Sequence, residues 1–567
     1  MRYGYFDDAA KEYVITRPDT PTPWTNHLGS AEYGAVITNN AGGFSFYKSG
    51  AQGRFLRFRP LGIPEAQPGR YFYLRDRVSG DYWSASWQPV GKDLAAYKTT
   101  CRFGTGYAII TSSYSDITSE STYFVPRGQN FEYWLLKLSN TGKKPRKLSV
   151  FTYVEFSSEW RVYHDMVNMQ YSQHIVKATY RDGIIGHHLL GNLQPDPEHF
   201  ENADQCRRTF LALAGAKVTG FDTKREVFIG PYRSYANPWV VEHGKCTNSL
   251  AYGDNMCGTL QVDVDLASGG EIELVVMLGI GDAAVEGRAV KRTYGSPARA
   301  HAELQALKAY WHSHLDVLHA RTPDKAFNSM VNVWNAYNNI VTFTWARAAS
   351  LVYQGERDGF GYRDTVQDSL GAAALMPAEV EARLELMLTG QVANGGAMPI
   401  VKPFAHRPGH ETPPPEHAFR SDDCLWLFFA VPEYVKETGD LGFFERVLPY
   451  ADHGEATVLH HLKQALVFNL ERRGAHGLPC GLLADWNDCL VLGQRGESVF
   501  VAFQLRYALL VYAEICRRLQ REEEAHWADV QRAELDHAIQ AHTWDGKWFV
   551  RAYYEDGTVL GLSLIHI

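Results

Sequence analysis

Two carboxylates three residues apart mark the stretch of this chain that is best suited to chemistry. Residues 481–490 read Gly-Leu-Leu-Ala-Asp-Trp-Asn-Asp-Cys-Leu, so Asp485 and Asp488 flank an indole and an amide side chain. A glycosidic oxygen needs a proton to leave, a carboxylic acid is the usual donor, and an aromatic face suits the C–H surface of a pyranose. The alternative is a tight turn in which one Asp caps a helix and Trp486 fills core, because Asp and Asn are common cap and turn residues.

Two further stretches carry unusual polar density. Residues 355–368 contain three glycines and a set of charged side chains that includes Arg357, Arg363, Asp364 and Asp368. Glycine lets a backbone approach a ligand, so this stretch is either a ligand loop or a salt-bridged surface loop. Residues 395–426 pass from Gly-Gly through Pro-Pro-Pro to Arg-Ser-Asp-Asp, a pattern that favours a proline-stiffened linker and an Asp-capped helix start.

The first half of the chain has the pattern of β-strands. Residues 260–266 alternate between apolar and polar side chains, and Ser-Gly-Gly separates them from a second run at 272–278, which predicts an antiparallel hairpin. Residues 131–138 and 148–156 repeat the arrangement with more apolar strands, as expected where sheets pack face to face. We therefore expect a large β-sandwich over residues 1–290.

The pattern becomes helical after Pro297. Apolar residues recur at helical spacing from 304 to 318, which predicts a helical linker over residues 291–320. One buried helical stripe is then expected at Phe327, Met330, Trp334 and Tyr337. Further helices are expected at 378–391, 454–471, 498–520 and 523–541. Serial helices joined by long loops indicate an all-α domain whose loops build a site.

Composition narrows the class of partner. The net charge of -8, the pI near 6.3 and the lack of a long basic run argue against nucleic acid or an anionic membrane. Acidic residues near the start stand where a secretion signal would have its apolar segment. The eight cysteines are scattered along the chain, which fits reduced thiols in a cytoplasm. His460 and His461 are adjacent on an expected helix and make a poor metal pair, so we expect no metal.

Several separated motifs together resemble one known family. They are Met-Arg-Tyr-Gly-Tyr-Phe-Asp-Asp at 1–8, Gly-Gly-Phe-Ser-Phe-Tyr at 42–47, Gly-Tyr-Arg-Asp-Thr at 361–365 and Ala-Asp-Trp-Asn-Asp-Cys at 484–489. Over the chain to about Leu560 they resemble the disaccharide phosphorylases of glycoside hydrolase family 94, whose members act on cellobiose, chitobiose or cellobionic acid. The resemblance implies an N-terminal β-sandwich, a helical linker, an (α/α)6 barrel and a small C-terminal β domain, usually in a homodimer.

The implied reaction is inverting phosphorolysis of a β-1,4-linked disaccharide to an α-sugar 1-phosphate, with inorganic phosphate as co-substrate and no cofactor. Phosphate is already anionic at neutral pH, so one carboxylic acid suffices. By motif match Asp488 is the general acid, Trp486 lines the donor-sugar site and Asp485 is scaffold. The resemblance also assigns Arg357, Arg363 and Asp364 to a loop that binds the donor sugar. Asp368 would stand behind these residues and support them.

The acceptor sugar stays open between glucose, gluconate and N-acetylglucosamine. Residues 168–171 read Asn-Met-Gln-Tyr where cellobiose-acting members have an Asn-aromatic-Gln-Arg run, which argues against plain cellobiose. Lys402 could attract the carboxylate of cellobionic acid. An inverting glycosidase and a non-catalytic carbohydrate-binding protein are the alternatives, and the glycosidase would need a second carboxylate as base.

The expected domains are the sandwich over 1–290, the linker over 291–320 and the barrel over 321–560. Residues 561–567 resemble no family segment, and the family continues for further barrel helices where this chain ends. We therefore expect an incomplete barrel that lacks most of the phosphate site, and a chain that has no phosphorylase activity as written.

Overall fold

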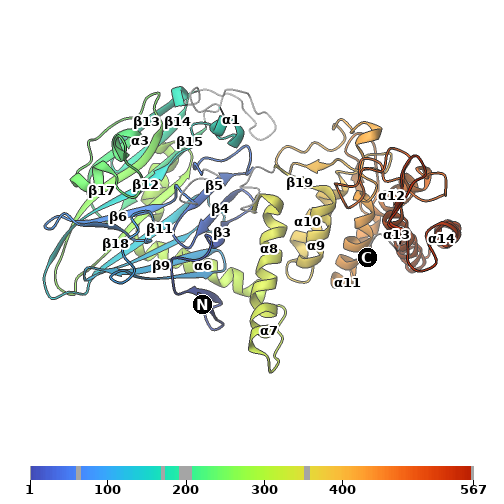
Figure 1. Ribbon diagram of the computed structural model, residues 1–567, viewed down its shortest axis with the longest axis horizontal. Helices are drawn as coiled ribbons and strands as arrows, with labels where there is room; N and C mark the ends of the chain where they lie inside the picture. The colour runs from blue at the N-terminus through green and yellow to red at the C-terminus, as the bar shows by residue number, and fades with distance from the viewer. Residues whose placement is uncertain (1, 59–65, 168–172, 191–206, 350–357, 563–567) are drawn as a thin grey trace. The chain divides into compact units, whose positions relative to one another are not determined.

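The chain folds into two compact units, Met1–Asp358 and Gly359–Ile567. The computed structural model describes residues 2–58, 66–167, 173–190, 207–349 and 358–562 (Figure 1). The first unit contains all the long strands, and the second is mainly helical. The finer division at residues 290, 320 and 560 stays a prediction.

Two large antiparallel sheets form most of the first unit (Figure 1). The larger has the order β1 (Gly4–Asp7), β2 (Glu12–Ile15), β8 (Lys98–Gly104), β9 (Tyr107–Tyr114), β10 (Ile117–Phe124), β11 (Phe131–Asn140), β18 (Glu271–Ile280), β15 (Arg208–Ala214), β14 (Ile184–Leu189) and β13 (Val176–Arg181). The smaller has the order β16 (Val218–Lys224), β17 (Met256–Leu266), β12 (Arg146–Glu155), β6 (Tyr71–Asp76) and β7 (Tyr82–Ser84). A three-stranded sheet is formed by β3 (Thr25–Gly29), β4 (Tyr33–Thr38) and β5 (Gly43–Tyr47).

The core lies between the two larger sheets. Trp134 of β11 and Phe72 of β6 belong to different sheets and meet edge to face, with ring centroids 6.1 Å apart. Both rings are fully buried in one continuous hydrophobic cluster. Alternating apolar side chains on the strands of both sheets supply that cluster, as expected of a sandwich.

The predicted hairpins are wrong in their pairing. The turn at residues 268–270 joins β17 to β18, but β17 pairs with β12 and β16 in the smaller sheet, whereas β18 pairs with β11 and β15 in the larger one. The same holds for β11 and β12. Each connection therefore crosses from one sheet to the other, because both strands bury an apolar face in the core between them.

Helices follow the sandwich. Ser296 caps α6 (Pro297–Leu315) through its side chain, and α5 (Arg288–Tyr294) precedes it. α7 (Lys325–Ser329) and α8 (Asn335–Trp345) are joined by a π-helical turn (Met330–Trp334). This turn inserts an extra residue, so the predicted stripe is wrong at Phe327, which is 52% exposed, and Met330, which is 36% exposed. Short helices lie elsewhere in the first unit, at α1 (Val162–Val167), α3 (Arg225–Ile229) and α4 (Trp239–His243).

The helices described in the second unit are α9 (Tyr362–Ala372), α10 (Pro377–Leu388), α11 (Leu427–Thr438), α12 (Val458–Glu471), α13 (Val499–Arg518) and α14 (Glu522–His542). The predicted helices correspond to α10, α12, α13 and α14. The loop predicted over residues 355–368 is wrong from Tyr362 onward, because Tyr362, Thr365, Val366 and Ser369 are buried at helical spacing along α9. Short strand pairs close the loops, at β19 (Phe360–Gly361) with β20 (Ile400–Val401), β21 (Val447–Pro449) with β22 (Glu455–Thr457), and β23 (Glu497–Ser498) with β24 (Ala552–Tyr553) and β25 (Val559–Leu560). Among the described residues α13 is the one helix long and apolar enough to cross a membrane, and 61% of its apolar window is buried inside the fold, as in a core helix.

Candidate active site

Backbone pairing holds two loops of the second unit side by side. Arg420 forms an antiparallel bridge with Leu482, and the Leu483 amide donates to the Phe419 carbonyl at 3.0 Å. The Ser421 amide donates to the carbonyl of Ala484. These contacts bring the Arg-Ser-Asp-Asp stretch against the Ala-Asp-Trp-Asn-Asp-Cys stretch.

Asp485 is fully buried and its carboxylate accepts three hydrogen bonds. The donors are the Asn487 amide at 2.8 Å, the Ser498 hydroxyl at 2.6 Å and the Arg551 guanidinium at 2.6 Å. A carboxylate held from three sides has little capacity left for a substrate. Its contacts shape the turn that follows and tie it to the N-terminus of α13, which Ser498 caps.

Asp488 lies at the other end of the same turn and is open to solvent. Its side chain is 60% exposed. Its Oδ1 accepts from Nη2 of Arg363 at 2.7 Å and from Nε of Arg420 at 3.1 Å. Partial burial raises the pKa of this carboxyl, but the two arginines lower it by more, so its pKa lies below the ordinary value. Asp488 is therefore a carboxylate at neutral pH.

Arg363 connects the two loops to the start of α9. Its Nη1 donates to Asp422 at 2.9 Å and to the carbonyl of Asp485 at 2.6 Å, while Nη2 reaches Asp488. Burial lowers the pKa of Arg363, but Asp422 and Asp423 raise it by more. The guanidinium is thus a fixed positive charge that spaces the carboxylates around it.

The predicted Asp cap at the Arg-Ser-Asp-Asp stretch is wrong. Asp422 makes no side-chain capping bond and is fully buried, where it accepts from Arg363 and from the Trp426 indole at 3.0 Å. Burial raises the pKa of both Asp422 and Asp423. Arg420 and Asp422 were missed as site residues, although the density of charge between Pro-Pro-Pro and an apolar helix was a usable signal.

The remaining predicted residues spread along α9 and the loop. Asp364 is in the first turn of α9, next to Arg363. Asp368 is one turn further on and interacts with Arg383 of α10, whose pKa burial lowers to about 10 against the opposing effect of Asp368. Trp486 is 53% exposed, so the alternative in which it fills core is wrong. Arg357 and residues 168–171 lie outside the described residues.

The described residues contain no candidate metal site. Among them, no group of three or more His, Cys, Asp or Glu side chains is placed to hold a metal ion. The chemistry that the site offers is that of one accessible carboxylate beside two arginines, a set suited to proton transfer and to binding an anion.

Comparison with known proteins identifies the class. Residues 11–297 match the glycosyl hydrolase 94 supersandwich domain, and residues 310–564 match the glycosyl hydrolase 94 superfamily catalytic domain. An N,N'-diacetylchitobiose phosphorylase of Vibrio proteolyticus is 37% identical over 99% of this chain and 71% of its own length. A solabiose phosphorylase of Paenibacillus borealis is 28% identical over 99% of this chain and 69% of its own length. A bacterial glucoamylase solved with acarbose has the same fold, with a TM-score of 0.55 at 10% identity over 97% of this chain and 74% of that one.

The chain belongs to the glycosyl hydrolase 94 family. The predicted enzyme class, a disaccharide phosphorylase that uses inorganic phosphate as co-substrate, is confirmed with it. The predicted fold class, an N-terminal β-sandwich followed by a helical catalytic domain, is confirmed as well, and the glucoamylase likeness supports an (α/α)6 arrangement of the helices.

Proposed function

We propose that the full-length protein cleaves N,N'-diacetylchitobiose by inverting phosphorolysis, with Asp488 as the proton donor. The main support is sequence identity. The chain is 37% and 36% identical to two diacetylchitobiose phosphorylases over 99% of its length, but 24% identical to a cellobionic acid phosphorylase. Among the predicted substrates this favours chitobiose over cellobiose and cellobionic acid. Lys402 is then not the acceptor-reading group.

The proposed step needs one carboxyl group. Phosphate attacks the anomeric carbon, the bond from that carbon to the bridging oxygen breaks, and Asp488 gives its proton to the departing oxygen. Both arginine contacts use Oδ1 of Asp488, so Oδ2 is the atom that can carry the proton. In the reverse direction the same atom takes the proton back from the acceptor hydroxyl.

Arg363 and Arg420 also control the protonation of Asp488 in this proposal. They lower the pKa of Asp488, which disfavours the protonated acid. A phosphate anion that attacks from the opposite face of the donor sugar adds negative charge near Asp488 and its two arginines, so the pKa of Asp488 rises once the co-substrate is present. Proton donation is thereby coupled to phosphate binding.

The donor sugar is assigned to the residues around this pair. We propose that Trp486 stacks on the sugar ring and that Arg363, Asp364 and Arg357 bind its hydroxyl groups, with Asp368 supporting them through α9. We also propose a homodimer in the cytoplasm. All seven cysteines in the described ranges are free thiols, in keeping with a reducing compartment. Light scattering on the purified full-length protein tests the dimer.

The product sugar phosphate tests the substrate. The full-length protein is incubated with phosphate and, in parallel, with N,N'-diacetylchitobiose, cellobiose and cellobionate, and phosphorus NMR follows the products. We expect N-acetylglucosamine 1-phosphate in the α configuration from the first substrate and at most slow turnover of the others. Sugar release without phosphate would identify a glycosidase instead, and preferred turnover of cellobionate would contradict the chitobiose assignment.

A further inference from the structure

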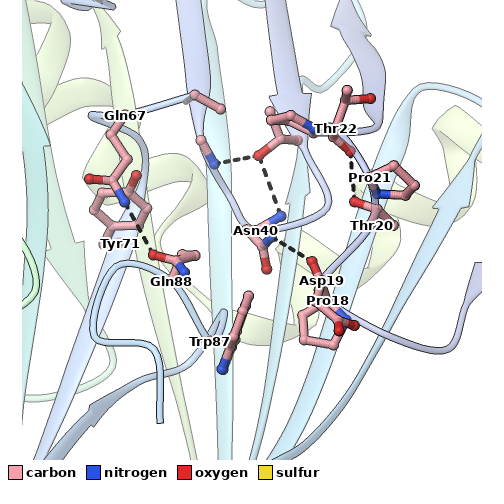
Figure 2. A pocket seen from close by; sticks show the side chains of 14 residues that line it. Pro18, Asp19, Thr20, Pro21, Thr22, Asn40, Gln67, Tyr71, Trp87 and Gln88 are labelled. Atoms are coloured by element: carbon pink, nitrogen blue, oxygen red, sulfur yellow. Dashed lines mark hydrogen bonds between the residues drawn. The ribbon is translucent and has the colours of Figure 1, made fainter. Parts of the chain in front are cut away.

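A pocket of about 300 Å³ in the first unit has walls of the kind that bind small ligands (Figure 2). Its walls come from residues 18–23 between β2 and β3, from the turn that joins β4 to β5, and from the segments before β6 and after β7. Every described lining residue belongs to the first unit, whereas Asp488 belongs to the second.

Asn40 holds an unused acceptor in this pocket. Its Nδ2 donates to the Pro18 carbonyl at 3.0 Å, but its Oδ1 is buried and has no hydrogen-bond partner among the described residues. Figure 2 shows Asn40 between the residues 18–22 and the Gln88 side of the pocket. A buried amide oxygen without a donor is costly, and a small shift of the Asn40 side chain toward the pocket would let a ligand hydroxyl or N–H group satisfy it.

Gln67 and Gln88 form the side of the pocket next to Tyr71 (Figure 2). Nε2 of Gln67 donates to Oε1 of Gln88 at 3.2 Å. This bond leaves the carbonyl oxygen of Gln67 as an acceptor and the amide group of Gln88 as a donor. This side of the pocket therefore offers one acceptor and one donor. The pair suits a ligand hydroxyl group, which can both donate and accept a hydrogen bond.

Trp87 supplies an aromatic surface that is held in a strained position. Its backbone φ is 66°, a left-handed value that bulky residues rarely adopt, and its indole N–H donates to the Lys92 carbonyl at 2.8 Å. Tyr71 adds a second, buried ring on the Gln67 side. Fixed rings beside convergent amides suit the C–H face and the hydroxyl rim of a pyranose.

The charge of the lining favours a neutral ligand. Asp19 is the one charged residue among the described lining residues, and its Oδ1 accepts from Nε of Arg17 at 2.8 Å. We propose that this pocket is a second, non-catalytic saccharide site that takes one pyranose unit of a neutral saccharide. It would hold carbohydrate on the first unit while Asp488 acts in the second.

A fluorine label at Trp87 tests the site directly. The full-length protein is labelled with 5-fluorotryptophan, the Trp87 and Trp239 signals are assigned from Trp87→Phe and Trp239→Phe, and cellobiose, N,N'-diacetylchitobiose and open-chain sorbitol are titrated separately. We expect a saturable shift of the Trp87 signal with at least one disaccharide, and none with sorbitol or at Trp239. A Trp87 signal that stays in place with both disaccharides, or moves equally with sorbitol, would overturn the proposal.

Two amide variants then locate the contact. Asn40→Leu and Gln88→Leu should each raise the midpoint of the Trp87 titration at least about tenfold, the effect of losing a buried hydrogen-bonding group in a binding site. Asn338→Leu, an exposed amide change in the same unit, is the control and should leave the midpoint unchanged. Unchanged midpoints in both folded pocket variants would refute the assignment. The readout requires no turnover, so its failure and the failure of the phosphorolysis proposal are distinguishable.

Discussion

Two arginine–carboxylate networks, one in each unit, differ in how far they are closed to solvent. In the first unit Arg70 and Glu132 are both fully buried, with Nε of Arg70 2.5 Å from Glu132. Glu132 also accepts from the Ser45 hydroxyl at 2.8 Å and the Trp134 indole at 2.7 Å. In the second unit Arg363 is nearly buried, but it links buried Asp422 to Asp488, whose side chain is 60% exposed.

This difference distinguishes a network with a structural role from one that can act on a substrate. The Glu132 network is closed, since its oxygens are used by protein donors and no solvent reaches it, so it can only stabilise the sandwich. The Asp488 network is open at one end, where the carboxylate of Asp488 and the partly exposed Arg420 side chain reach solvent. An open end of this kind can exchange its partners for a phosphate or a sugar hydroxyl.

Asp488→Asn should give the largest effect, because it removes the only proposed proton donor at the open end. Turnover with phosphate by the full-length protein should fall by about 10²–10⁴-fold or more, the usual contribution of a general acid. Binding of the disaccharide, measured by calorimetry, should persist because the amide keeps the shape of the side chain. Asp556→Asn, at an exposed turn, is the matched control. Near-normal turnover of the Asp488 variant would show that Asp488 is not the proton donor, and the open network would then have no catalytic role.

Glu132→Gln should give the next largest effect, on stability. Removing one partner of a closed pair leaves the Arg70 charge buried, at a cost of about 3–5 kcal/mol. Hydrogen exchange of the β11 amides, followed by mass spectrometry, reports the local loss without assuming that both units unfold together. The double variant Arg70→Met/Glu132→Leu should recover much of the loss, since no uncompensated charge remains. Equal protection in Glu132→Gln and the parent would show that this network does not stabilise the sandwich.

Local pattern predicted the elements but not every pairing. The helix starting at Pro297 and the helices α10, α12, α13 and α14 follow from apolar spacing and caps, which are local properties. α9 was missed because its polar and glycine-rich start has the composition of a loop. The turn at residues 268–270 has the sequence of a hairpin turn, yet its strands enter different sheets. That choice depends on which partners complete each sheet, a long-range fact that strand periodicity does not carry.

The site residues also fall into those that local motifs predicted and those that depend on long-range contacts. Asp488 and Arg363 come from motifs, and the structure brings them to 2.7 Å of each other. Arg420 could not be assigned from spacing, because it is 68 residues from Asp488 and reaches it only through the bridge to Leu482. The low pKa of Asp488 was equally beyond sequence, since it follows from two arginines that converge from separate segments.

Arg420→Leu should give the smallest effect, a shift in pH dependence. Arg420 lowers the pKa of Asp488, so its removal raises that pKa and lets the protonated acid persist to higher pH. The alkaline limb of kcat/KM for phosphorolysis should therefore move upward, by about one pH unit or less for a pair this exposed. Arg472→Leu, which removes a similar Nε contact to Glu416, is the control and should leave the limb in place. A downward shift would contradict the sign of this argument. An unmoved limb with reduced kcat would mean that Arg420 only positions the loop, and the open network would then consist of Arg363 and Asp488 alone.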